Sequence, residues 1–199
     1  FTAEQLIADT EQIEHGMGLR PDWPNVGVIS MAHSYGFSSL VLPLLLKGVP
    51  LIWVGDAMPA PVAKALESTG EVTIPGVPAL WRAWFDAGIL DDRVKLAISA
   101  GAPLTSELET SVYREAGVKI HNFFGASECG GIAFDDSDEP REDEDYLGRF
   151  LEGVSVEVGP EDGLLVRSDA VGAGYWPSGN GAIEERSFSL RDLGTIHGD

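Results

Sequence analysis

Residues 118–132 contain, in close order, side-chain types that can bind a charged ligand. The β-forming run VKIH leads into the sequence NFFGASECGGI. Phe124 could stack on a planar ring, and Gly125 would let the backbone approach a ligand closely. Ser127 and Glu128 offer oxygen ligands to phosphate and to magnesium. Such residues also occur in ordinary structural turns, so the stretch indicates either a binding loop or a turn.

A second loop, SAGAPL at residues 99–104, follows the apolar run VKLAI and precedes a helical pattern. By itself it is best explained as an ordinary tight connection between a strand and a helix. In open α/β sheets, however, ligands bind at the carboxyl ends of the strands. The loop in 118–132 is expected at such an end, and SAGAPL repeats its arrangement of strand and glycine turn.

The elements that must position these loops alternate along the chain. Runs rich in Val, Ile and Leu begin about every two dozen residues, with helical patterns between several of them. The runs start near Val26, Val49, Val72, Val94 and Val118. This alternation predicts an α/β fold, a mostly parallel sheet with covering helices built from βαβ units, followed by a smaller β-rich subdomain.

Local signals mark the ends of two helices and one distortion. Thr2 and Gln5 form a capping-box pattern ahead of the first apolar periodicity. Thr105 or Ser106 could cap a later helix that Gly117 ends. Proline lacks a backbone donor, so Pro43, inside the apolar segment after His33, predicts a kink.

An acidic segment divides the chain. Residues 135–145 read DDSDEPREDED, with eight acidic residues around one arginine. Because the glycine that a calcium loop needs is absent, a solvated connection is favoured over a calcium site. We expect an α/β subdomain at 1–134, a connecting loop at 135–146 and a β-rich subdomain at 147–199. In the last, VSVEV and GLLVR are predicted strands joined by a Pro-Glu-Asp-Gly turn.

Composition excludes several classes of protein. Thirteen basic against 32 acidic residues give a net charge of −19, so nucleic acid is a poor partner. No apolar stretch approaches the roughly 20 residues that cross a bilayer. Cys129 is the only cysteine, which permits no internal disulfide, and we expect a packed, unreactive thiol. No leader precedes the first helix, so a cytoplasmic location is expected.

These motifs, in this order, resemble the adenylate-forming superfamily of acyl-CoA synthetases, nonribosomal-peptide adenylation domains and firefly-type luciferases. FFGASE looks like its aromatic, Gly, any residue, Ser or Thr, Glu signature, and SAGAPL like its adenine-side loop. MAHSYGF (31–37) resembles the segment with its pocket-gating histidine. LGRFLEGVSVEV, DGLLVRS and GYW resemble the strands that follow, and RDLG (191–194) falls where the family places a ribose-binding aspartate.

The resemblance implies a two-step reaction between a small carboxylic acid, ATP and coenzyme A. The acid attacks the α-phosphorus of ATP to give an acyl-adenylate, and coenzyme A then takes the acyl group. Ser127 would bond a phosphate oxygen, Glu128 would hold Mg²⁺ and His33 would close the acyl side of the site. The ATP or AMP nucleotide would contact Gly101, Ala102, Pro103, Asn122, Phe123, Phe124, Gly125 and Asp192. The acid pocket would include Tyr35, Phe37, Ser38, Val77, Ala100 and Ile132.

The sequence also departs from the family pattern. The family's phosphate loop with its lysine would lie before Phe1, and its small C-terminal domain with the catalytic lysine beyond Asp199. Leu190-Arg191-Asp192 replaces Thr-Gly-Asp, which keeps the carboxylate but puts an arginine beside it. We therefore expect a central piece of the large N-terminal domain of an acyl- or aryl-CoA synthetase, inactive alone.

Other functions remain open from the residues. One alternative is a noncatalytic module that binds a nucleotide or an acyl group. Another is a serine hydrolase using Ser127, but a nucleophile elbow needs G-x-S-x-G and Cys129 occupies the place of the second glycine. Without the family pattern, His33 would be an ordinary residue at a strand end and Asp192 an ordinary turn residue.

Overall fold

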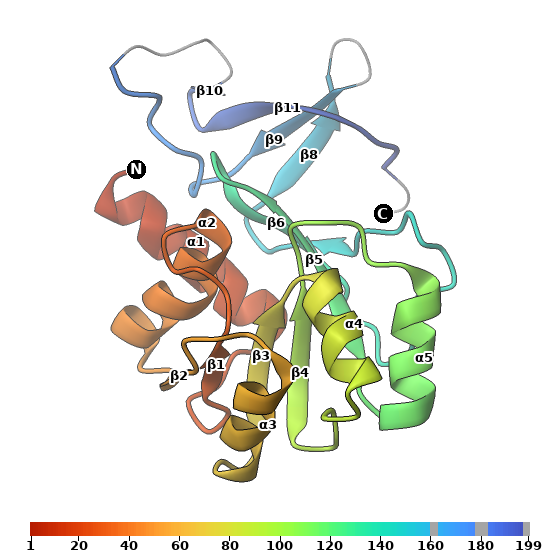
Figure 1. The fold of residues 1–199 in the computed structure, drawn as a ribbon. Helices are drawn as coiled ribbons and strands as arrows, with labels where there is room; N and C mark the ends of the chain where they lie inside the picture. Colours follow the sequence, from red (N-terminus) through yellow and green to blue (C-terminus); the bar gives the residue numbers. More distant parts are fainter. Residues whose placement is uncertain (160–162, 178–182, 197–199) are drawn as a thin grey trace.

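A seven-stranded sheet forms the larger part of the fold, and a four-stranded antiparallel sheet lies above one end of it (Figure 1). The computed structural model describes residues 1–159, 163–177 and 183–196. In spatial order, the strands of the large sheet are β2 (Leu51–Trp53), β1 (Asn25–Gly27), β3 (Val72–Gly76), β4 (Val94–Ser99), β5 (Ile120–Ala126), β6 (Gly130–Phe134) and β7 (Arg149–Phe150). The first five pair in parallel, and β6 and β7 are antiparallel. The predicted fold class is confirmed.

Helices cover both faces of this sheet. They are α1 (Ala3–Met17), α2 (Ser34–Gly36), α3 (Pro59–Glu67), α4 (Pro78–Asp86) and α5 (Ser106–Ala116), with two π-helical stretches, η1 (Phe37–Val41) and η2 (Pro43–Lys47). One apolar cluster joins α3, α4 and α5 to the sheet, and a second joins α1 to it. Ala97 belongs to the first cluster and its neighbours Leu96 and Ile98 to the second, because successive side chains of a strand point to opposite faces.

The two helix-capping signals act as expected. The Thr2 hydroxyl and the Gln5 side chain form the complete capping box of α1. Thr105 is the N-cap of α5, and Gly117 ends this helix in the left-handed conformation at φ 68°. Pro43 is the first residue of η2, and only Leu42 separates it from the end of η1, so it lies within a segment that is already π-helical; the kink expected at Pro43 stays a prediction.

The small sheet has the order β10 (Ile183–Glu184), β11 (Ser187–Leu193), β9 (Gly163–Arg167) and β8 (Ser155–Val158). The predicted strands VSVEV and GLLVR correspond to β8 and β9, whereas residues 160–162 of the predicted turn lie outside the described residues. A third apolar cluster joins this sheet to β6 through residues such as Ile132, Val166 and Phe188. The short strand β7, just after the acidic connection, still pairs with β6 of the large sheet.

Candidate functional site

The two loops that the sequence singles out lie at the same edge of the large sheet. Strands β4 and β5 are parallel neighbours, and Ser99 at the end of β4 pairs with Asn122 in β5. The loop that contains Gly101, Ala102 and Pro103 leaves β4 at this edge, and β5 continues to Ala126. The carboxyl ends of parallel strands are where ligands bind in open α/β sheets. The sheet topology therefore brings the two loops together.

Ser127 and Glu128 lie in the tight turn between β5 and β6. Cys129 N–H donates to the Ala126 carbonyl at 3.2 Å and closes the turn. Two glycines make this possible. A Cβ on Gly125 would lie 2.6 Å from the Gly130 carbonyl oxygen, and Gly130 has a φ of 73°, which side-chain-bearing residues rarely adopt. The hydroxyl of Ser127 is exposed, whereas the Glu128 side chain is half-buried.

A segment from the first third of the chain meets this turn. The hydroxyl oxygens of Ser34 and Ser127 are 2.8 Å apart and form a hydrogen bond. Ser34 begins α2, and His33 before it is the N-cap, whose Nδ1 accepts a 3.2 Å hydrogen bond from the Tyr35 N–H. His33 itself is exposed. The structure therefore brings His33, Ser127 and Glu128, the expected catalytic residues, to one region.

Glu128 has a partner that the sequence did not indicate. The Tyr175 hydroxyl donates a 2.8 Å hydrogen bond to Oε1 of Glu128, and Gly172 N–H donates to the Glu128 carbonyl at 2.8 Å. Burial, together with the neighbouring carboxylate, raises the pKa of Tyr175, so this phenol remains a donor at neutral pH. Gly172 and Tyr175 follow β9, so the loop after β9 holds both the backbone and the side chain of Glu128 in place.

The donor set at this turn suits magnesium better than a metal held by protein alone. Within the described ranges, no three His, Cys, Asp or Glu side chains are grouped to hold a metal ion. Magnesium is usually bound through one or two carboxylates together with phosphate oxygens and water. A single carboxylate, Glu128, beside the exposed hydroxyl of Ser127 fits this mode, in which the substrate supplies the remaining ligands.

A buried carboxylate connects three elements beneath the turn. Asp9 of α1 accepts a 2.6 Å hydrogen bond from the Ser38 hydroxyl and a 2.9 Å hydrogen bond from the Gly131 N–H. Burial raises the pKa of Asp9, and these two hydrogen bonds partly offset the increase. The sequence contained a signal for this residue, since Asp9 falls on the apolar face of α1, four residues before Ile13.

The expected acid-pocket residues divide into two groups. Tyr35, Phe37, Ser38 and Val77 are half-buried, whereas Ala100 and Ile132 are buried. The Tyr35 hydroxyl donates to the carbonyls of Gly76 and Ile98, each at 3.3 Å, which places this ring at the ends of β3 and β4. Ile132 belongs instead to the cluster under the small sheet. Tyr35 and its neighbours are thus placed at the edge of the large sheet, and Ile132 is a core residue.

The expected nucleotide residues are also divided. Gly101, Ala102 and Pro103 are exposed, and Gly125 is exposed in the hairpin. Phe124 is half-buried against the cluster under the small sheet, whereas Phe123 is buried and packs near Tyr35, with ring centroids 6.1 Å apart. Asn122 is buried, and its Nδ2 donates to the Leu147 carbonyl at 3.4 Å. Phe123 and Asn122 therefore support the site from beneath.

Asp192 belongs to the small sheet, whereas the other expected nucleotide residues belong to β5 or to the loop after β4. It is exposed on β11, in the irregular stretch between Leu190 and Leu193 where the pairing with β9 shifts register. Within the part of the chain that the structure describes, no hydrogen bond or ion pair joins Asp192 to the turn at Ser127. The bulge keeps both Arg191 and Asp192 at the surface.

A buried ionic network anchors the acidic connection next to the loop at residues 99–104. Glu109 of α5 is fully buried between Lys119, at 2.7 Å, and Arg141, at 2.9 Å. Lys119 also pairs with the buried Asp135 at 2.5 Å, and Arg141 donates to the Leu104 carbonyl at 2.7 Å. The connection is therefore attached to the loop after β4. The acidic composition of residues 135–145 did not predict this attachment.

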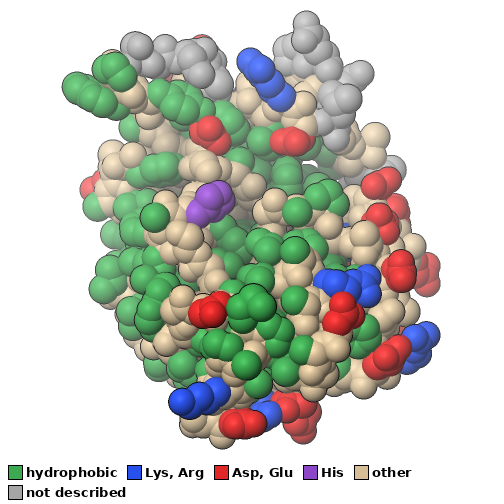
Figure 2. Space-filling view, viewed as in Figure 1, with side chains coloured by type: hydrophobic (Ala, Val, Ile, Leu, Met, Phe, Trp, Pro, Cys, Tyr) green, Lys and Arg blue, Asp and Glu red, His purple; other side chains and the backbone are tan. Residues whose placement is uncertain are grey.

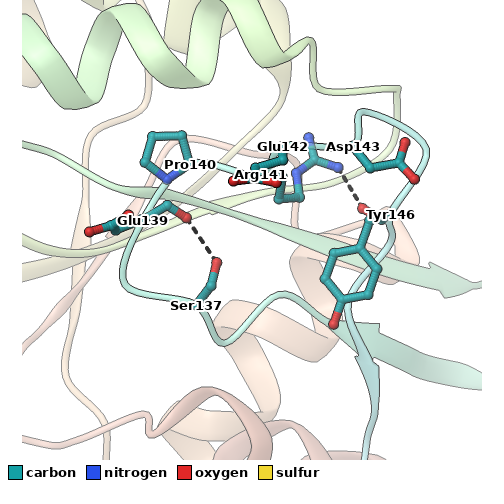
Figure 3. Close-up of a pocket in the computed structure, with 7 residues that line it drawn as sticks. All are labelled: Ser137, Glu139, Pro140, Arg141, Glu142, Asp143 and Tyr146. Carbon is teal, nitrogen blue, oxygen red and sulfur yellow. Dashed lines mark hydrogen bonds between the residues drawn. The ribbon is translucent and has the colours of Figure 1, made fainter. Parts of the chain in front are cut away.

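The remaining acidic residues of the connection face solvent. Figure 3 shows a pocket in it, where Ser137 bonds the Glu139 carbonyl and Arg141 bonds the Tyr146 carbonyl. Figure 2 shows acidic side chains along the right-hand side of the molecule, over α5 and the neighbouring connection. Among the described helices, none is long and apolar enough to cross a membrane.

Comparison with known proteins identifies relatives of both sequence and fold. A family model described as AMP-binding enzyme matches residues 1–176. The long-chain-fatty-acid–CoA ligase FadD15 of Mycobacterium bovis is 32% identical over 114 residues, which are 55% of this chain and 18% of the ligase. The ligase of the same name from Mycobacterium tuberculosis is 31% identical over 114 residues. The chain thus spans less than one fifth of the length of these relatives.

Solved structures share the fold at low sequence identity. Apo MatB from Rhodopseudomonas palustris aligns with a TM-score of 0.81 and 18% identity, over 94% of this chain and 40% of MatB. The o-succinylbenzoate CoA synthetase MenE from Bacillus subtilis, in complex with its acyl-adenylate intermediate, aligns with a TM-score of 0.82 and 13% identity, over 94% and 41% of the two chains. The family model covers most of the sequence, and the chain belongs to the AMP-binding enzyme family.

Proposed function

We propose that this chain is the nucleotide- and acid-binding part of an AMP-forming acid–thiol ligase, an acyl- or aryl-CoA synthetase longer than the chain itself. The observation that carries the proposal is the 2.8 Å hydrogen bond that joins the Ser127–Glu128 turn to the segment of His33 and Ser34. The turn offers a hydroxyl and a carboxylate to phosphate and a divalent cation. The other segment continues into the half-buried aromatic residues Tyr35 and Phe37, which suit an apolar acid.

The proposed reaction is the one that the resemblance to adenylate-forming enzymes implies. In the first step, a carboxylate oxygen of the acid attacks the α-phosphorus of ATP, a P–O bond forms, and the bond to pyrophosphate breaks. In the second, the thiol of coenzyme A loses its proton to water, its sulfur bonds to the acyl carbon, and the bond between that carbon and the AMP oxygen breaks, so that a thioester and AMP are formed. Ser127 would donate a hydrogen bond to a phosphate oxygen, and Glu128 would hold Mg²⁺, which would supply positive charge against the phosphates. His33 closes the acyl side.

The remaining residues take supporting roles in the proposal. Phe124 and the loop 101–103 flank the adenine, and Asp192 accepts hydrogen bonds from the ribose hydroxyls, as a carboxylate with two acceptor oxygens can. The subdomains 1–134 and 147–199 would then contribute different sides of the nucleotide site, joined by the connection at 135–146. Coenzyme A as the acceptor and a cytoplasmic location belong to the same proposal.

The relatives support a carboxylic acid as the substrate, since they are a long-chain-fatty-acid–CoA ligase and an o-succinylbenzoate CoA synthetase. The structure gives the serine-hydrolase alternative no support. The hydrogen-bond partner of the Ser127 hydroxyl is the hydroxyl of Ser34, which cannot act as the base that a nucleophilic serine needs.

The proposal is tested by carboxylate-dependent exchange of pyrophosphate into ATP with the complete ligase that contains this chain. Exchange above a blank without acid is expected, and the 199-residue chain alone is expected to show none. Nucleotide binding by the complete protein without exchange for any acid in a broad panel would instead favour a noncatalytic binding module. Labelling of Ser127 by an active-site serine probe would favour the hydrolase.

A further inference from the structure

We propose that Ser34 is a positioning residue that orients the Ser127 hydroxyl toward the phosphate of the nucleotide. The inference rests on the proposed function and concerns a residue outside the expected site. The two serines are 93 residues apart in the sequence, and their hydroxyl oxygens are 2.8 Å apart. Either hydroxyl can be the donor in the free protein.

The backbone at Ser34 holds its side chain in place. His33 caps the short helix α2 through its side chain, and Phe37 N–H donates to the His33 carbonyl at 2.9 Å. On the other side, a Cβ on Gly36 would lie 2.1 Å from the Ser30 carbonyl oxygen, so the segment before α2 packs directly on the helix. The local fold therefore fixes the backbone and the Cβ of Ser34, from which one rotatable bond places its hydroxyl against Ser127.

A second connection holds the same two segments together. Ser38, one helical turn after Ser34, donates to Asp9, and Asp9 accepts from the N–H of Gly131, next to the Ser127 turn. This connection is buried at Asp9, whereas the one between Ser34 and Ser127 is exposed. The buried hydrogen bonds of Asp9 fix the distance between the two segments. The exposed hydrogen bond between Ser34 and Ser127 is therefore not needed for this, and it can orient the Ser127 hydroxyl toward the ligand.

The chemistry of hydroxyl groups gives the exposed connection its direction. A serine hydroxyl carries one proton and can accept further hydrogen bonds. If Ser127 donates its proton to a phosphate oxygen, it can keep its hydrogen bond to Ser34 only as the acceptor. Ser34 must then donate. A Ser127 hydroxyl that accepts from Ser34 is restricted to rotamers that point its proton elsewhere, toward the ligand, and this restriction lowers the entropic cost of binding.

The test uses the complete ligase and compares Ser34→Ala with the wild type and with Ser34→Thr, which keeps the hydroxyl. A typical net hydrogen bond predicts that Ser34→Ala lowers kcat/KM for ATP about 3- to 10-fold. The KM for the acid should stay unchanged, since general damage to α2 would raise it. Ser34→Thr should restore most of the loss. Ser30→Ala removes a nearby hydroxyl that accepts a hydrogen bond from the Ala32 N–H at 3.3 Å, and it should have no effect.

A double-mutant cycle with Ser127→Ala decides whether Ser34 acts through Ser127. In the Ser127→Ala background, Ser34→Ala should cause no further loss of kcat/KM for ATP. An equal loss in both backgrounds, or no loss in the wild-type background, overturns the inference while wild-type exchange activity leaves the proposed function standing. A wild-type ligase without carboxylate-dependent exchange overturns the proposed function, and the role of Ser34 with it.

Discussion

Oδ1 of Asp9, on the first helix, accepts a 2.9 Å hydrogen bond from the N–H of Gly131, 122 residues further along the chain. The carboxylate packs so closely on the hairpin that a Cβ on the adjacent Gly130 would lie 2.1 Å from the same oxygen, so a larger residue could not replace this glycine without moving Asp9. Helix α1 therefore supports the hairpin that carries Ser127 and Glu128. Asp9, although far from Ser127 and Glu128 in sequence, therefore helps to position the turn that carries them.

Replacing Asp9 with alanine should destabilise the protein. The change leaves the buried Gly131 N–H and the Ser38 hydroxyl without their acceptor, which typically costs about 1–3 kcal/mol of unfolding free energy. Urea unfolding measures the loss. Glu11→Ala, an exposed change on the same helix, serves as the control and should stay within about 0.5 kcal/mol. Equal stability of the Asp9→Ala and Glu11→Ala variants would contradict the supporting role.

The titration of Asp9 gives the same contact a pH dependence. Burial raises the folded-state pKa of Asp9 above its ordinary value of 3.8, so the folded protein binds this proton at higher pH than the unfolded chain. The unfolding free energy of the wild type, relative to Asp9→Asn, should therefore increase as pH falls through the folded-state pKa and level off below about 3.8. Urea titrations of both proteins between pH 7 and 4 measure this difference in unfolding free energy. A difference that decreases as the pH falls would show that folding does not raise the pKa of Asp9.

The thiol of Cys129 should be unreactive in the folded protein. Its side chain is fully buried, and burial raises the pKa of the thiol to about 12, so almost no thiolate is present at neutral pH. A chromogenic disulfide reagent at pH 8 should titrate no thiol in the native chain and one per chain in denaturant. Rapid modification without denaturant would mean that the hairpin opens readily.

The ionic network at Glu109 should be important for stability. Glu109→Ala leaves the buried Arg141 guanidinium without its carboxylate, and breaking a buried ion pair on one side typically costs about 3–5 kcal/mol. Glu107→Ala, an exposed change in the same helix, is the matched control. Denaturant unfolding of the two variants gives the comparison. If both lose the same small amount, Arg141 finds other partners and the network does not anchor the connection.

In the complete ligase, Glu128→Gln should reduce turnover more than nucleotide affinity. The amide keeps the shape of the side chain but removes the charge that would hold magnesium, and loss of one such electrostatic group typically lowers kcat about a hundredfold. Steady-state kinetics at saturating magnesium, with ATP affinity measured separately, distinguish the two effects. Unchanged turnover would remove Glu128 from the metal site.

The acid that is activated should carry no α-amino group. Residues 34–46 contain no carboxylate, whereas the amino-acid-activating members of the family that the sequence resembles are expected to place an aspartate shortly after the segment corresponding to residues 31–37. Burying an ammonium without an anionic partner costs several kcal/mol. Pyrophosphate release by the complete ligase, measured for a panel of amino acids beside fatty and aryl acids, checks this. A clear preference for any amino acid would reverse the assignment.

The sequence determined the fold class, the succession of the five parallel strands along the chain, and three helix boundaries. Alternating β-branched runs and helical patterns imply parallel strands, because each strand needs a crossover helix to return to the same edge. Thr2 and Thr105 cap the starts of their helices and Gly117 ends one. Local sequence predicts these positions because the backbone groups that each cap residue bonds belong to residues a few positions away. The loops around Gly101 and Ser127 could be predicted because each is a local motif that directly follows a strand-forming run.

The tertiary structure alone decided which distant residues meet at the site. Ser34 with Ser127, Asp9 with Gly131, and Tyr175 with Glu128 are hydrogen-bond pairs separated by 93, 122 and 47 residues. Periodicity and capping report interactions within a few residues of one another. A hydrogen bond between segments depends instead on how whole helices and sheets pack, and a short polar side chain leaves no pattern that identifies its partner.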